Sequence, residues 1–160
     1  GMGLTFPHAG MMMRQWTPEP MPKELVDDQA IYRRALDFVQ RAPTPSRPEG
    51  RAYIAYWKAR LEFAVEYFDA IDAARKGACA EKAAKDARQK ADDRTYRARL
   101  KEALEHAKTA HATAFRAIDT YAAVAKNRAD AGAVATMAEY VCRQLNRKAG
   151  DLAAELNKKP

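Results

Sequence analysis

Apolar residues recur at helical spacing through most of this 160-residue chain. In the segment 95–126 they follow one another at alternating intervals of four and three residues from Leu100 to Ala125, with His111 at one position of the series. Such spacing keeps one face of a long α-helix apolar and is typical of a helix that packs along a neighbour. We therefore predict a helix over 95–126, with Asn127 ending it in the left-handed region and Asp130 capping the helix that follows.

A shorter helix is predicted to start between residues 23 and 27. It ends before Pro43, because the residue before a proline avoids the α region. The apolar residues of this segment recur at the i, i+4, i+7, i+8 spacing of a helix that is buried on one side. Its predicted core face consists of Ile31, Ala35, Phe38 and Val39.

The next helix is predicted to begin at Ser46 and Glu49, whose S-x-x-E spacing matches a capping box. Its apolar residues again alternate between steps of three and four, which is the pattern of a heptad seam. The seam consists of Ile54, Trp57, Leu61, Ala64, Phe68 and Ile71. Gly77 is a candidate end or kink of this helix, because glycine weakens a helix interior.

A fourth helix is predicted over 131–156, with Gly150 marking either close packing or a break. Together these segments predict an all-α fold, in which three long helices and one shorter N-terminal helix form an antiparallel bundle. The bundle would occupy residues 23–158. Residues 1–22, which contain four prolines (Pro7, Pro18, Pro20 and Pro22), would form an extended N-terminal arm.

Large apolar side chains in the arm indicate that it docks against protein. Left in water, each such side chain would lose roughly 1.5–3 kcal/mol of burial free energy. Phe6 and Trp16 are therefore candidate partner-docking residues. Tyr56 is a third candidate, because it is the aromatic residue of the second helix that is most readily exposed.

The net charge of +7 is concentrated in one stretch of the chain. Residues 75–101 contain ten Lys or Arg and four Asp or Glu, which leaves +6. This stretch would lie at the tip of the hairpin of two long helices, where it could attract phosphate groups. The candidate polyanion-binding residues are Lys82, Lys85, Arg88, Lys90, Arg94, Arg97 and Arg99. Tyr96 is the one aromatic residue in this stretch that could stack on a base. The alternative to polyanion binding is therefore a pair of basic helices whose charges are simply solvated.

The sequence carries no recognisable catalytic motif. It has no G-x-G-x-x-G or P-loop pattern, and its single serine, Ser46, is expected at a helix start. Glu62, Glu66 and Asp69 share one helix face, but no histidine stands in the Glu-x-x-His pattern of a di-iron site. We therefore expect a non-enzyme without metal or cofactor, whose acids pair with Lys or Arg of a neighbouring helix.

Cys79 and Cys142 are far apart and in no zinc-binding spacing. We expect free thiols that serve as small apolar side chains, with one disulfide as the alternative. No segment resembles a signal peptide or a membrane span. We therefore expect no membrane partner, and the sequence does not indicate a compartment.

Five short stretches within residues 16–148 carry a resemblance to known proteins. They are Trp16-Thr-Pro-Glu-Pro, Ala30-Ile-Tyr-Arg-Arg-Ala-Leu, Tyr56-Trp-Lys-Ala-Arg-Leu-Glu-Phe, Asn127-Arg-Ala-Asp-Ala-Gly and Glu139-Tyr-Val-Cys-Arg. Together they are similar to helical modules that follow the catalytic domain in large bacterial glycoside-hydrolase-like proteins. The resemblance implies an accessory, non-catalytic domain of a longer protein. Gly1 ahead of Met2, which is typical of an expression-tag remnant, fits a domain boundary.

The sequence thus favours a non-catalytic helical structural or interaction module, as an accessory domain of a carbohydrate-active multidomain protein. Its partner would be a neighbouring domain of the parent protein or a second copy of the chain. The alternative is a small basic helical subunit that binds nucleic acid through the cluster from Arg75 to Lys101.

Overall fold

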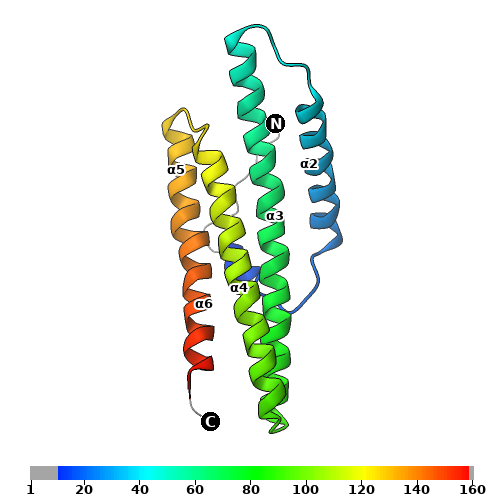
Figure 1. Cartoon of the computed structure of the whole chain (residues 1–160), viewed down its shortest axis with the longest axis vertical. Helices are drawn as coiled ribbons and strands as arrows, with labels where there is room; N and C mark the ends of the chain where they lie inside the picture. Colours follow the sequence, from blue (N-terminus) through cyan, green and yellow to red (C-terminus); the bar gives the residue numbers. More distant parts are fainter. Residues whose placement is uncertain (1–10, 159–160) are drawn as a thin grey trace.

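The structure, a computed structural model, describes residues 11–158. Over that range the chain is all-α and has no strand, which confirms the predicted fold class (Figure 1). The elements are α1 (Met11–Arg14), α2 (Lys23–Arg41), α3 (Pro48–Gln89), α4 (Asp93–Ala122), α5 (Arg128–Met137), the π-helical turn η1 (Ala138–Cys142) and α6 (Arg143–Leu156). Phe6, a predicted docking residue, lies outside the described residues.

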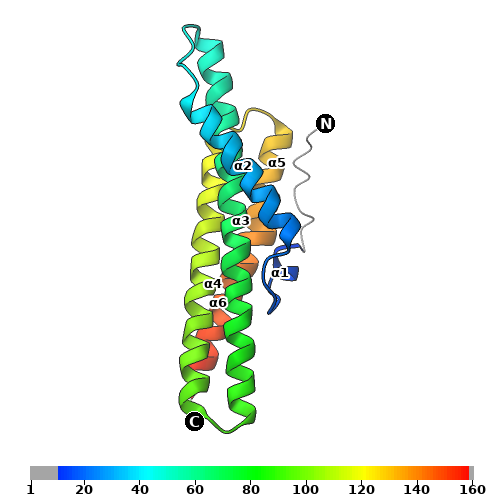
Figure 2. The same ribbon diagram turned by 90° about the vertical axis from the view of Figure 1, so that its right-hand side faces the viewer.

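The two longest helices, α3 and α4, form an antiparallel hairpin (Figures 1 and 2). Much of their interface is alanine, and the completely buried residues of both helices include Ala70, Ala74 and Ala84 of α3, and Ala103, Ala107 and Ala110 of α4. Such small side chains let two helix backbones approach closely, so that the interface is held by many backbone and methyl contacts.

The turn between α3 and α4 is closed by hydrogen bonds at both helix ends. Ala91 takes a φ of 55°, and the N–H groups of Ala91 and Asp92 bond the carbonyls of Arg88 and Ala87 at 3.0 Å each. This is the arrangement of a Schellman motif. Asp92 then caps α4 by accepting the Thr95 N–H at 3.0 Å. Because these end groups are satisfied, the chain reverses within residues 90–92.

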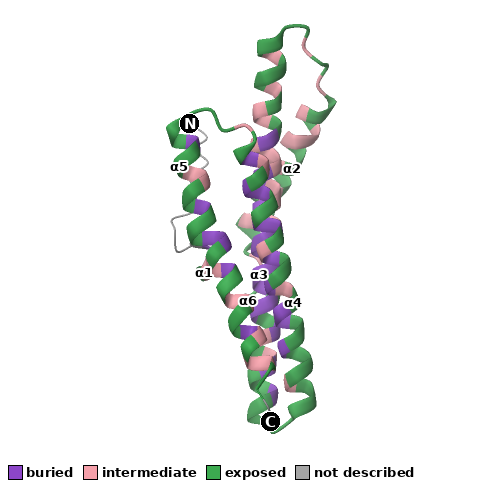
Figure 3. Ribbon diagram, turned by 60° about the vertical axis from the view of Figure 1, so that its left-hand side comes forward, coloured by how far each residue is buried: buried purple, intermediate pink, exposed green. Residues whose placement is uncertain are grey.

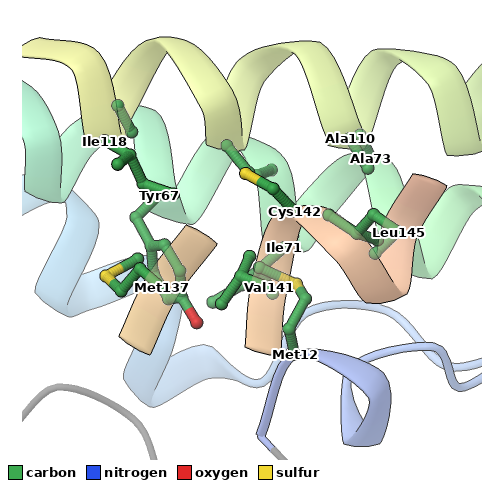
Figure 4. Close-up of a cluster of buried hydrophobic side chains, with 14 of the residues drawn as sticks. Met12, Tyr67, Ile71, Ala73, Ala110, Ile118, Met137, Val141, Cys142 and Leu145 are labelled. Atoms are coloured by element: carbon green, nitrogen blue, oxygen red, sulfur yellow. The ribbon is translucent and has the colours of Figure 1, made fainter. Parts of the chain in front are cut away.

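The segment 131–156 is helical as predicted, but the helical run begins at Arg128, and the π turn η1 divides it into α5 and α6. A π turn holds more residues than an α turn, and here it brings the sequence neighbours Val141 and Cys142 into the core together (Figure 4). They pack there with Met12 of α1, Tyr67 of α3 and Leu145 of α6. Gly150, predicted to mark close packing or a break, does neither: it lies inside α6 without interrupting it, and nothing stands within 4 Å of where its Cβ would be.

The unequal lengths of the hairpin helices leave one end of α3 without α4 beside it. Helix α3 has 42 residues and α4 has 30, a difference of twelve. Counted from the turn, residues 48–59 of α3 extend beyond α4 by about 18 Å. Figures 1 and 2 show this extension with α2 as its neighbour. Helix α2 packs on α3 alone for much of its length and is therefore an edge helix.

The predicted core face of α2 is wrong at two positions. Ile31 is 53% exposed and Phe38 is 75% exposed, whereas Tyr32 packs its ring 5.8 Å from that of Phe68 on α3. Gln29 and Arg33 orient α2 by donating to Asp69 of α3 at 2.7 and 2.8 Å. With α3 as its neighbour, α2 covers only one stripe, whose residues are of intermediate exposure, and none of its residues is fully buried (Figure 3).

The predicted capping box at the start of α3 is also wrong. Arg47 occupies the N-cap position without a side-chain cap, and Pro48 is the first helical residue. Proline at this position has no N–H to satisfy and already has a helical φ. The Ser46 carbonyl instead accepts from the Arg51 guanidinium at 2.6 Å. The fixed φ of Pro48, and not a side-chain cap, thus starts α3.

The predicted extended arm contains one turn of helix, α1, and its described part packs onto the bundle. We call residues 12–22 the N-terminal strap. Met12 is almost fully buried, and the Trp16 ring lies over Gly77 of α3. A Cβ at Gly77 would stand 2.5 Å from Cη2 of Trp16. Gly77 therefore neither ends nor kinks α3; it makes room for the strap.

We expect Gly77→Ala to displace the strap. Alanine favours a helix over glycine by about 1 kcal/mol, but here the added methyl overlaps the Trp16 ring. In a Trp57→Phe background, the emission of Trp16 should shift to longer wavelength and the melting temperature should fall. The matched control is Gly150→Ala, where nothing lies within 4 Å of the new Cβ; it should raise stability and leave the emission unchanged. Unchanged emission and higher stability in Gly77→Ala would contradict this packing.

Candidate functional site

The strap is fixed to α3 by Arg75, which belongs to the predicted basic stretch but is buried at 7% exposure. Its guanidinium donates to the Gln15 side chain at 2.7 and 3.0 Å. It also donates to the Glu19 and Pro20 carbonyls at 3.2 and 2.9 Å. All four bonds end on the strap, so Arg75 serves an internal contact and contributes little to the basic surface.

A second anchor of the strap is the carboxylate of Glu81 on α3. It accepts the Trp16 indole N–H at 2.7 Å and forms ion pairs with Lys148 of α6 at 2.7 Å and Lys85 at 2.9 Å. The Lys148 ammonium also lies 5.1 Å from the centre of the Trp16 ring. Burial alone would raise the pKa of Glu81, but these hydrogen bonds outweigh it and lower the pKa to about 2.

Trp16, a predicted partner-docking residue, is therefore engaged inside the chain. Its indole N–H and its ring edge contact α3, and its ring face contacts Lys148 of α6. The Trp16 side chain is half-buried. Docking of a separate partner by Trp16 stays a prediction, and the contacts described here use most of the groups that such docking would need.

Tyr56, another predicted docking residue, lies in a polar cluster at the end of α4. We call this the Arg60 cluster (Tyr56, Arg60, Tyr121, Lys126 and Asp130). Arg60 donates to the Tyr56 and Tyr121 hydroxyls at 2.7 and 3.1 Å, and Tyr121 donates to the Asp130 carboxylate. The Lys126 ammonium lies 5.5 Å from the centre of the half-buried Tyr56 ring.

Asp130 ties the α4–α5 turn to this cluster. Its second carboxylate oxygen accepts the Lys126 N–H at 3.0 Å, and Arg60 lies 3.9 Å from its first. The hydrogen bond from Tyr121, more than any other cause, lowers the pKa of the Asp130 carboxyl. Burial, followed by the bond to Asp130, raises the pKa of the Tyr121 hydroxyl. The cluster thus surrounds the ionised Asp130 carboxylate with hydrogen-bond donors, and this arrangement can hold the α4–α5 turn in place.

Both predictions made at this turn, Asn127 ending α4 in the left-handed region and Asp130 capping the next helix, are wrong. Asn127 is extended and caps α5, accepting the Asp130 N–H at 2.9 Å, and α4 ends at Ala122 rather than at 126. Asp130 is buried and bonds Tyr121 instead of capping a helix. The spacing Asn127-x-x-Asp130 fits an N-cap at either residue, and only the contact with Tyr121 decides between them.

At the hairpin tip, all seven predicted polyanion-binding residues are exposed. Four of them have partners within the chain. Lys85 pairs with Glu81 and Arg99 with Glu102, whereas Arg88 pairs with Glu155 of α6 at 2.9 Å. Arg97 donates to the Leu156 carbonyl at the end of α6 at 2.9 Å. Two of these cations, Arg88 and Arg97, therefore join α6 to the hairpin.

Within residues 11–158, the remaining three cations of that prediction, Lys82, Lys90 and Arg94, have no ion pair. Tyr96, the aromatic residue beside them, donates its hydroxyl to Glu155 at 2.8 Å and carries the Arg88 guanidinium 5.2 Å from its ring centre. Hydrogen bonds from Lys158, Tyr96 and Arg88 lower the pKa of Glu155 to about 2, against the opposing effect of burial. The tip is less available to a polyanion than its sequence indicates.

Other candidate chemistry stays dispersed in the described part of the chain. Two acids of the acidic face of α3 pair with a neighbouring helix as predicted, Glu66 with Arg116 and Asp69 with Arg33, both at 2.8 Å, whereas Glu62 pairs with Lys58 of α3 itself. No group of three or more His, Cys, Asp or Glu within residues 11–158 is placed to hold a metal ion. Over the same residues, none of the helices is long and apolar enough to cross a membrane.

Both cysteines are free thiols, as expected. Cys142 lies in the core, and its burial raises the pKa of the thiol to about 11. Cys79 is exposed on α3. At neutral pH the buried thiol therefore stays protonated and behaves as an apolar side chain.

Of the large apolar side chains that are exposed in the described part of the chain, three lie on α2 and one on the free end of α3, whereas Phe115 of α4 and Tyr140 of η1 are exposed elsewhere. Phe38 and Ile31 point away from α3 on the same side of α2. Tyr53 is 62% exposed on the free end of α3, and its ring and that of Trp57 meet edge to face with their centres 6.3 Å apart. This apolar surface is the candidate functional site, and sequence periodicity assigned two of its residues to the core.

Comparisons with known proteins identify no relative of this chain. No family model matches the chain, and neither a curated protein nor a solved structure is detectably similar to it.

The Arg60 cluster generates a prediction about acid stability. Its Asp130 carboxylate has a lowered folded-state pKa, so its contribution is present above the unfolded pKa of about 3.9 and is lost as pH falls toward the folded value. Asp130→Ala should cost about 1–3 kcal/mol at pH 7, because Tyr121 and Arg60 lose a buried acceptor. Asp130→Asn, which keeps an oxygen acceptor, should cost less.

The measurement is urea unfolding of wild type and both variants at pH 7 and below the unfolded pKa. The stability gap between wild type and Asp130→Asn should shrink on acidification. A gap that stays constant or widens would show that the Asp130 charge is not stabilised by these donors.

Proposed function

We propose that this chain is a non-catalytic helical interaction module that docks through the apolar surface of α2 and the free end of α3. The bundle of long antiparallel helices, with the shorter α2 along its edge, serves as the support that presents this surface. Following the sequence resemblance, the module would be an accessory domain of a carbohydrate-active multidomain protein.

The observation that carries the proposal is the exposure of Phe38 and Ile31 on an edge helix. Burying a side chain of this size is worth roughly 1.5–3 kcal/mol, and Ile31 and Phe38 lie two turns apart on the same side of α2, where one partner could cover both. In contrast, Trp16 and Tyr56 are already engaged within the chain. The α2 surface is therefore the better candidate for docking than the residues predicted from sequence.

A second candidate function is polyanion binding at the hairpin tip. Lys82, Lys90 and Arg94 favour it, because they are exposed and have no ion pair in the described part of the chain. The carboxylates paired with Lys85, Arg88 and Arg99 weigh against it weakly, since they compete with a phosphate for these cations but exposed ion pairs contribute little.

The first experiment compares a surface variant, Ile31→Lys with Phe38→Glu, with a tip variant, Lys82→Glu with Lys90→Glu and Arg94→Glu. Each is measured in dilute solution for binding of a fluorescent apolar probe. All the substituted side chains are exposed, so both variants should keep the wild-type circular dichroism and melting temperature. The surface variant should lose most of the probe binding and the tip variant should retain it. Equal probe binding by both variants would overturn the proposal.

The same proteins test the second candidate with a short DNA duplex over a series of salt concentrations. The logarithm of the binding constant falls with slope about 0.9 per engaged cation. Three unpaired cations would give a slope of about 2.7, and all seven predicted cations would give about 6.3. We expect binding no steeper than the first value. A slope near the second, abolished in the tip variant, would favour nucleic-acid binding instead.

A further inference from the structure

The exposed side of α2 has a regular pattern that its apolar residues alone do not explain. Six residues follow one another at alternating steps of three and four, and all six are exposed: Glu24, Asp27, Ile31, Arg34, Phe38 and Arg41. This spacing is that of a helix-pairing seam. It runs along the side of α2 away from the stripe, including Tyr32 and Leu36, that faces α3. We call these six residues the α2 outer seam.

Charge is distributed along the α2 outer seam with opposite sign at its two ends. The N-terminal end carries Glu24 and Asp27, and the C-terminal end carries Arg34 and Arg41. A helix of this kind placed antiparallel to a copy of itself brings each acidic end against a basic end. The helix dipoles of two antiparallel helices also attract one another.

We propose that two copies of this chain associate through their α2 outer seams, antiparallel and about a two-fold axis. The inference rests on the proposed docking function and names the partner as a second copy. The seam is its own complement, as a two-fold interface requires: with the axis between residues 32 and 33, Glu24 of each copy faces Arg41 of the other. Asp27 faces Phe38, and Ile31 faces Arg34.

In this register each copy would cover the apolar residues of the other. Phe38 would lie between Glu24 and Ile31 of the other copy, over their aliphatic carbons, and the Arg34 stem would cover Ile31 while its guanidinium reaches Asp27. Within the single chain, Asp27 binds Lys23 at 2.5 Å and Arg41 binds Asp37 at 2.8 Å. These solvent-exposed pairs contribute little free energy, so Asp27 and Arg41 can also interact with charges of the second copy.

The size of the seam sets the expected affinity. From residue 24 to residue 41 it is about 26 Å long, and one helix face of this length buries less than the roughly 800 Å² per partner of a standard stable interface. The association should therefore depend on concentration, with monomer at about 5 µM and dimer increasing toward about 500 µM.

The test uses sedimentation equilibrium on wild type and two charge-reversal variants. One variant, Glu24→Arg with Asp27→Arg, makes the seam basic throughout. The other, Arg34→Glu with Arg41→Glu, makes it acidic throughout. Each variant alone should be at least about tenfold weaker in self-association than wild type, because like charges then face one another. An equimolar mixture of the two should recover a dimer containing one copy of each.

The tip variant, which also reverses surface charges but lies far from α2, serves as the matched control and should associate like wild type. Phe38→Ser is a second variant that does not depend on charge; since Phe38 is exposed, it should fold normally and dimerise less.

Self-association is overturned if wild type stays monomeric at the highest concentration, or if the mixture does not dimerise. If that happens while the α2 surface still binds the apolar probe, the proposed docking function stands with a different partner; loss of both removes both proposals.

Discussion

The difference in length between α3 and α4 is the constraint on which the rest of the structure depends. The two helices leave their common turn together, but α3 continues twelve residues beyond the end of α4. At the point where α4 ends, the Arg60 cluster holds the α4–α5 turn in place. Beyond that point the bundle narrows to α2 and α3, and α2, which packs on α3 through Tyr32 and Arg33, keeps its outer side free.

The two polar assemblies on α3 have related roles. Near the end of α4, Arg60 gathers two tyrosine hydroxyls and lies close to Asp130. Near the middle of α3, Arg75 and Glu81 hold the N-terminal strap, and Gly77 between them leaves room for the Trp16 ring. Each assembly attaches an irregular segment to a helix pair whose alanine-rich interface is otherwise regular. The polar side chains of α3 thus organise connections, while the docking surface is apolar and lies elsewhere.

The sequence predicts the all-α fold because apolar residues that recur every three or four positions over long segments share one face only in a helix. The prediction fails where two stripes have the same spacing. Helix α2 carries two stripes, one through Tyr32 and one through Ile31 and Phe38, and the number of neighbours around α2 decides which is covered. No pattern along the chain supplies that number, because it depends on where distant helices pack in the folded chain. Periodicity also gives no sign of the π turn, which depends on the packing of Val141 and Cys142.

The candidate site is harder to predict than the fold, because contacts between segments that are distant in the sequence decide which side chains remain exposed. Trp16 and Tyr56 were expected to face a partner as large aromatic side chains, but their polar atoms find Glu81 and Arg60 within the chain. The basic stretch likewise loses Arg75 to the strap and Arg88 to Glu155. Composition indicates how many charges are present, whereas the contacts between distant segments decide how many remain available.

The central claim, that the outer side of α2 is the surface left open for a second copy, is tested most directly by hydrogen exchange measured on wild type at low and at high protein concentration. If copies pair through α2, amide protection should rise with concentration in peptides from residues 23–41, with little change in peptides from the hairpin tip around residues 82–101. Protection that is independent of concentration in α2, or that rises at the tip instead, would contradict the claim.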